Sequence, residues 1–75
     1  MSIRENISEL IKKKGMKQKY VAERAGFTEA DFSNMMRGKK IIRAEYLPVI
    51  ARAIGVDMNT IVGMDQSANN NYAKQ

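Results

Sequence analysis

The apolar residues of this chain recur at the spacing of an α-helix. Over residues 3–14 they follow one another at steps of four, three and one, which places them on a single helical face. That face consists of Ile3, Ile7, Leu10 and Ile11. Ser2 and Glu5 have the S-x-x-E spacing of a capping box, and Gly15 is a typical residue just past a helix end. Residues 3–14 are therefore predicted to form the first helix.

Two shorter helices are predicted next, over residues 18–25 and from Thr28 to Gly38, with a tight turn at Gly26 between them. The first of the pair has a small inner face made of Val21, Ala22 and Ala25. In the second, Phe32 and Met35 point to one side. The other side carries Glu29, Ala30, Ser33, Asn34 and Arg37. One apolar face and one hydrogen-bonding face suit a helix held against a core and pushed into the major groove of DNA.

A fourth helix is predicted over residues 45–54, with Leu47, Ile50, Ala51 and Ile54 inward. Pro48 is expected in its first turn, where a missing N–H does little harm, and Gly55 is expected to cap its end. Residues 39–44 form a loop between this helix and the preceding one. The chain shows no strand pattern, which indicates an all-α domain.

A fifth, short helix is predicted over residues 58–62, with Asp57 as its N-cap and Gly63 as its end. Residues 64–75 have no periodicity and are interpreted as a flexible tail. The sequence thus predicts one domain over residues 1–63, followed by that tail. A core of this size is small, so the domain is expected to be only modestly stable.

Positive charge is concentrated in the middle of the chain. The net charge is +5, but residues 12–43 hold ten Lys or Arg against three Asp or Glu. This segment therefore carries +7 and the remainder −2. A cationic middle favours a polyanionic partner such as nucleic acid, although a solvated surface has the same composition.

Several classes of function are disfavoured by composition. The chain has no cysteine and no histidine, which excludes disulfides, the usual zinc sites, thiol nucleophiles and histidine bases. No glycine-rich phosphate loop or nucleophile elbow is present. No enzyme activity, metal, cofactor or small-molecule substrate is predicted. No run of about 20 apolar residues suggests a membrane span, no signal peptide is recognised, and the cytoplasm is the expected compartment.

An ordered set of residues over about four fifths of the chain resembles the lambda- and 434-type repressor and Cro family, also called the Xre family. The matching residues are Gly15-Met16 with Gln18, Val21-Ala22 before Ala25-Gly26, Thr28, Ser33, Gly38, Leu47-Pro48, Ala51 and Ile54-Gly55-Val56. The resemblance implies a five-helix lambda-repressor-like fold. It also implies that the second and third helices form a helix-turn-helix whose second helix enters the major groove.

The resemblance further implies a set of DNA-binding residues. Lys17 and Gln18 lie at the start of the second helix, and Lys39, Lys40 and Arg43 lie in the loop that typically meets the phosphate backbone. The recognition helix contributes Thr28, Glu29, Ala30, Ser33, Asn34 and Arg37. Asn34 has the chemistry to bind adenine at N6 and N7. Dimerisation in the family uses the end of the domain, here Met58, Ile61 and Met64.

The chain departs from the family pattern in three places. Lys17 replaces a common Ser or Thr cap, which removes a cap but adds a cation near the expected phosphates. Glu29 and Asp31 place two negative charges at the helix end that faces DNA. Ile11 and Met36 replace an arginine–glutamate pair of many relatives and are expected to pack together.

The predicted function is a sequence-specific, double-stranded DNA-binding transcriptional regulator. It is expected to be a repressor or Cro-like switch protein that acts by occupying an operator as a homodimer. The alternative is a protein-interaction module on the same fold, such as an antirepressor or an antitoxin-like adaptor. The acidic start of the recognition helix favours the alternative, and the cationic flanks favour DNA.

Overall fold

The computed structural model describes residues 2–66, and every regular element in that range is helical. The elements are α1 (Ile3–Lys13), α2 (Gln18–Ala25), α3 (Glu29–Met36), the 3-10 turn η1 (Ala44–Tyr46), α4 (Leu47–Ile54) and α5 (Met58–Gln66). The all-α class and the order of five α-helices predicted from the sequence are confirmed. From residue 67 onward, the predicted tail lies outside the described residues.

The helix ends expected from capping residues are present. The Ser2 hydroxyl accepts a hydrogen bond from the Glu5 N–H at 3.1 Å, and the Glu5 carboxylate accepts one from the Ser2 N–H at 2.9 Å. The latter bond lowers the pKa of Glu5. The Thr28 hydroxyl accepts from the Asp31 N–H at 3.0 Å and caps α3 in the same way. Gly26 ends α2 with φ +88°, a conformation that favours glycine.

The start of α4 differs from the sequence prediction. The predicted helix began at Glu45, but α4 begins at Leu47 and η1 occupies the preceding residues. An α-helix extending further back would require an N–H from Pro48 to the Ala44 carbonyl, which proline lacks, and its ring would clash with that carbonyl. The chain instead makes 3-10 bonds, including Tyr46 N–H to the Arg43 carbonyl at 2.9 Å. Pro48 does lie in the first turn of α4, as predicted.

The end of α5 also differs. The prediction placed the end at Gly63, whereas α5 continues to Gln66. Gly63 has no positive φ, unlike the four glycines that do, so its backbone remains helical. Glycine lowers helix stability but does not by itself end a helix. The N-cap was predicted correctly, because the Asp57 carboxylate accepts from the Thr60 N–H at 2.9 Å.

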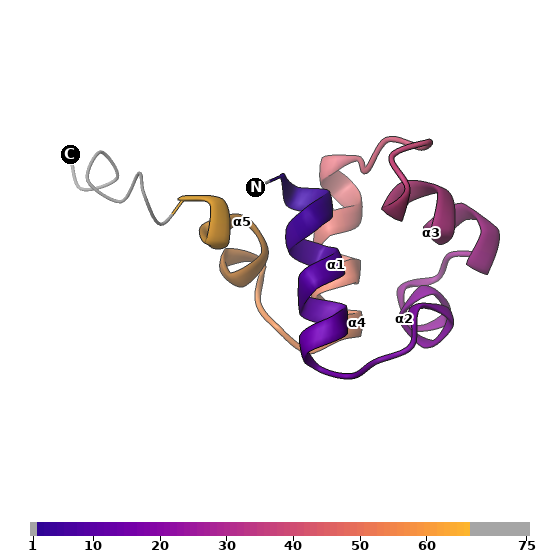
Figure 1. Ribbon diagram of the computed structural model, residues 1–75, viewed down its shortest axis with the longest axis horizontal. Coiled ribbons are helices and arrows are strands. Elements are labelled where there is room, and N and C mark those ends of the chain that lie inside the picture. The colour runs from indigo at the N-terminus through magenta and orange to yellow at the C-terminus, as the bar shows by residue number, and fades with distance from the viewer. Residues whose placement is uncertain (1, 67–75) are drawn as a thin grey trace.

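The helices enclose one core, and α3 and α5 lie on opposite sides of α1 (Figure 1). α2 packs mainly on α4, α1 packs on α5, and α3 rests against α2 and α1. The buried hydrophobic side chains are Ile7, Leu10, Ile11, Val21, Ala22, Phe32, Met35, Leu47, Ile50, Ala51, Ala53, Ile54 and Ile61. No described helix is both long enough and apolar enough to cross a membrane.

Three side chains fasten these helices to one another through backbone carbonyls. Asn6 is fully buried, and its Nδ2 donates to the Ile61 carbonyl of α5 at 2.7 Å. Arg4 Nη1 donates to the Met36 carbonyl at the end of α3 at 3.2 Å. Arg24 Nε donates to Ala53 of α4, also at 3.2 Å. No local pattern in the sequence indicates these roles, and the Arg4 contact ties the end of α3 to α1.

We expect Ile11 and Met36 to be energetically coupled. Ile11 belongs to the core and Met36 packs against that core from α3. Met36→Glu places a carboxylate in this partly apolar setting, so the free energy of unfolding should fall by about 1–3 kcal/mol. Adding Ile11→Arg should recover part of that stability, with a coupling energy of about 0.5–3 kcal/mol in urea unfolding. Strict additivity of the two substitutions would show that these residues are not neighbours.

Candidate nucleic-acid interface

The turn between α2 and α3 is fixed by backbone hydrogen bonds and an aromatic cluster. Phe27 N–H donates to the Ala22 carbonyl at 2.9 Å across the turn. The Phe27 ring stacks on Phe32, with centroids 6.1 Å apart, and meets Tyr46 edge to face at 5.0 Å. The cluster joins the turn, α3 and η1. α3 therefore has a defined orientation relative to α2.

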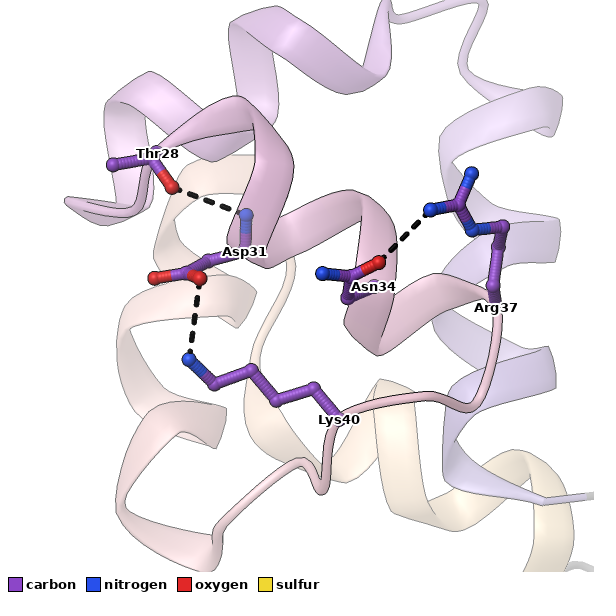
Figure 2. Close-up of polar contacts among 5 residues, drawn as sticks. All are labelled: Thr28, Asp31, Asn34, Arg37 and Lys40. Atoms are coloured by element: carbon purple, nitrogen blue, oxygen red, sulfur yellow. Dashed lines mark hydrogen bonds and ion pairs between the residues drawn. The ribbon is translucent and has the colours of Figure 1, made fainter.

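α3 has the two faces that the sequence predicted. Phe32 and Met35 are completely buried and anchor the helix. On the other side, Glu29, Ala30 and Arg37 are exposed, and Ser33 and Asn34 are partly exposed. Thr28, Asp31, Asn34 and Arg37 follow one another along this outer surface (Figure 2). The outer surface is small, polar and rich in hydrogen-bonding groups, as a helix in the major groove requires.

The loop after α3 turns back along the helix. The Asn34 carbonyl accepts from the N–H groups of Lys39 and Lys40, at 2.8 and 3.2 Å, and Gly38 supplies the positive φ that this turn needs. Lys40 Nζ consequently lies 3.3 Å from the Asp31 carboxylate (Figure 2). Both side chains are nearly half exposed, so the pair adds little stability. The pair does place a cation beside Asp31, one of the two acidic residues of α3 whose charge disfavours DNA binding.

The remaining predicted phosphate-contacting residues lie on the two segments that flank α3 in sequence. Lys17 and Gln18 are exposed at the start of α2, and no side chain caps that helix end. Its backbone N–H groups and positive dipole end suit a phosphate oxygen. Lys39 and Arg43 are exposed in the loop after α3, and Arg43 Nε lies 3.5 Å from the Glu45 carboxylate. Cationic side chains thus come from both elements that flank α3 in sequence.

Asn34 and Arg37 are joined by a hydrogen bond that the sequence analysis did not foresee. Arg37 Nη2 donates to Asn34 Oδ1 at 2.8 Å, across one turn of the helix (Figure 2). The i, i+3 spacing that permits this contact is visible in the sequence. The spacing alone does not indicate whether Arg37 turns back to the helix or out toward phosphates.

The residues predicted for dimerisation do not all lie at the surface. Met58 is 38% exposed on α5, but Ile61 is completely buried and its backbone carbonyl is bound by Asn6. Ile61 therefore has no side-chain surface to offer a second chain, and we correct its assignment from interface to core. Met64 lies within α5, and its side chain is outside the described part of the chain.

The fold, the turn between α2 and α3 and the polar face of α3 define a helix-turn-helix DNA-binding domain. Residues 6–67 match the family of Cro/C1-type HTH DNA-binding domains, and the chain belongs to that family. Membership confirms the resemblance and the lambda-repressor-like fold, and it makes double-stranded DNA the class of partner. No curated protein and no solved structure was found to match the chain. Among residues 2–66, no cluster of acidic side chains is placed to hold a metal ion.

Proposed function

We propose that this protein is a transcriptional regulator that binds a specific double-stranded operator and acts by occupying it, as a repressor or Cro-like switch protein does. We further propose that it works in the cytoplasm and binds its operator as a homodimer. The observation that carries the proposal is the division of α3, whose Phe32 and Met35 are buried while Ser33, Asn34 and Arg37 face outward. A rigid helix with a small polar face is what reading the major groove requires.

Two sets of residues have different proposed roles. The first set meets phosphates and sets affinity without regard to sequence; it comprises Lys17, Gln18, Lys39, Lys40 and Arg43. The second set lies on α3 and faces base edges; it comprises Thr28, Glu29, Ala30, Ser33, Asn34 and Arg37. Base preference is proposed to come from this second set, in which Ser33 and Asn34 are partly exposed on the outer face of α3. Glu29 has the chemistry to accept a hydrogen bond from cytosine N4.

The alternative function is a protein-interaction module on the same fold. It is favoured by the exposed Glu29 at the start of α3, since a carboxylate there repels phosphates. The second acidic residue, Asp31, is paired with Lys40, so its charge argues less strongly against DNA binding. The two functions differ in one observable, because only the regulator binds duplex DNA in a sequence-dependent way.

Selection of bound sequences from random duplex DNA tests the proposal. The regulator should enrich a short, defined sequence over several rounds at moderate salt. Enrichment should survive addition of an excess of unrelated duplex, which removes binders that contact only phosphates. Recovery of sequences no different from the starting pool would favour the interaction module.

The selected site is expected to be a pseudo-palindrome bound by two chains. One domain of this size makes few base contacts, so two copies are needed for a site of useful length. Half-site centres should lie about 10 base pairs apart or at a multiple of that spacing. Met58 and Met64 are the proposed contacts between the chains. The stoichiometry of the complex, measured by light scattering, checks this, and one chain on one asymmetric half-site would contradict it.

A further inference from the structure

Asn34 and Arg37 lie next to each other on the outer face of α3 and are already bonded in the free protein. Arg37 follows directly after the last residue of α3 and is exposed. Its guanidinium turns back along the helix, so that Nη2 lies 2.8 Å from Asn34 Oδ1 (Figure 2). One nitrogen of the guanidinium is therefore held at Asn34, one turn back along α3.

This contact bears on which base Asn34 can read. Binding adenine at two points requires the amide oxygen to accept from N6 and the amide nitrogen to donate to N7. In the structure the oxygen is engaged by Arg37, so an adenine amino group must share or displace that bond. The contact leaves Asn34 Nδ2 as a donor and weakens the case for adenine.

Guanine matches Arg37 better than adenine matches Asn34. A guanidinium carries five N–H groups, and one bond from Nη2 leaves a complete edge with two parallel donors. Guanine presents two acceptors in the major groove, N7 and O6, and an arginine that binds both is the commonest specific contact to a base. Asp31 lies one turn before Asn34 on the same row and is a second acidic or polar partner that attracts cations. Because Lys40 pairs with Asp31, Asp31 does not compete with Asn34 for Arg37.

We propose that Asn34 and Arg37 form one reading unit, in which Arg37 binds guanine through N7 and O6 while Asn34 holds the guanidinium in place. Arg37 is then the base-reading residue and Asn34 a positioning residue. This inference rests on the proposed function, since it names the base that the same face of α3 reads. It predicts a guanine at an equivalent position in each half-site.

The first test uses modified bases in the selected site, with affinity measured by fluorescence anisotropy. Replacing the specified guanine by 7-deazaguanine removes N7 and should weaken wild-type binding about tenfold or more. Replacing it by inosine keeps N7 and O6 and removes only the minor-groove amino group, so affinity should change little. Arg37→Ala should be insensitive to the 7-deaza replacement. Equal sensitivity of wild type and Arg37→Ala would overturn the assignment of Arg37.

The second test separates positioning from direct reading. For each variant, the ratio of affinities for guanine and for the other bases is measured at that position, which cancels any general change in charge. Asn34→Asp keeps an oxygen acceptor for Arg37 and should retain the guanine preference. Asn34→Ala removes the acceptor and should reduce that preference. Full guanine preference in Asn34→Ala would overturn the positioning role.

The remaining outcomes are also decisive. A specified adenine whose preference disappears in Asn34→Ala and persists in Arg37→Ala would show that Asn34 reads the base itself. Uniform weakening of all sequences by Arg37→Ala would make Arg37 a phosphate contact. Either result overturns the reading unit and leaves the proposed function intact, whereas a selection that yields no preferred sequence contradicts the proposed function.

Discussion

Phe32→Ala is expected to lower the free energy of unfolding by about 3–5 kcal/mol, the usual cost of removing a buried aromatic ring. Phe32 is completely buried on the inner side of α3 and stacks on Phe27. A small domain has a total stability of only about 5–15 kcal/mol, so this substitution removes a large part of it. Urea unfolding followed by far-ultraviolet circular dichroism measures the effect.

Tyr20→Ala is a matched control for the Phe32 substitution. Tyr20 is also an aromatic residue of the helix-turn-helix, but its side chain is 48% exposed on α2. Its ring makes a surface contact with Arg24, whose Cζ lies 5.4 Å from the ring centroid. We expect this variant to be destabilised by about 1 kcal/mol or less. Equal destabilisation of the two variants would mean that α3 is not anchored through Phe32.

DNA binding is expected to weaken steeply with salt. The proposed phosphate-contacting set has four cations per chain, Lys17, Lys39, Lys40 and Arg43, so two chains neutralise about eight phosphates, within the range of about 6–10 contacts. For that number, affinity should fall by about 10³–10⁵ between 50 and 200 mM salt. The slope of log affinity against log salt reports the number of phosphates neutralised. A slope near zero would contradict an interface built on these cations.

Lys40→Ala should lower the magnitude of that slope by about 0.9 for each phosphate that is no longer neutralised, and it should weaken binding to all sequences alike. In the free protein Lys40 pairs with Asp31, and leaving that half-exposed pair for a phosphate costs little. Lys13→Ala is the matched control, because Lys13 is an exposed lysine in the last turn of α1, outside the proposed interface. The control should keep the wild-type slope. An equal change in both variants would indicate a general effect of net charge.

Local sequence signals predicted most of the fold. Ser2, Thr28 and Asp57 cap their helices through bonds to residues three positions on, so a short window contains both partners. Gly26 marks the end of α2 because its positive φ disfavours other residues. Such signals depend on nearest neighbours along the chain and are readable without the structure.

Apart from the start of α4, where Pro48 acts locally, the failures arise where distant parts of the chain meet. Nothing near Ile61 in the sequence indicates that α5 packs on α1 and that the Ile61 side chain is buried, so the sequence alone places this residue at an interface. The bonds of Arg4, Asn6 and Arg24 join residues 32, 55 and 29 positions apart, and no local pattern encodes them. Gly63 remains helical because packing of α5 on α1 outweighs its weak helix propensity.

The candidate site was predicted in outline but not in detail. The polar face of α3 follows from helical periodicity, which distinguishes Phe32 and Met35 from Ser33 and Asn34. The pairing of side chains within that face does not follow from helical periodicity. Arg37 and Lys40 each have several rotamers that reach solvent, and only the turn at Gly38 brings Lys40 back to Asp31.

The proposed regulator binds duplex DNA in a sequence-specific way through α3. The most direct test of this specificity is the ratio of dissociation constants for the selected site and for a scrambled duplex of the same length and base composition, measured at physiological salt. We expect a ratio of about 10³ or more in favour of the selected site. Equal affinity for the two duplexes would contradict it.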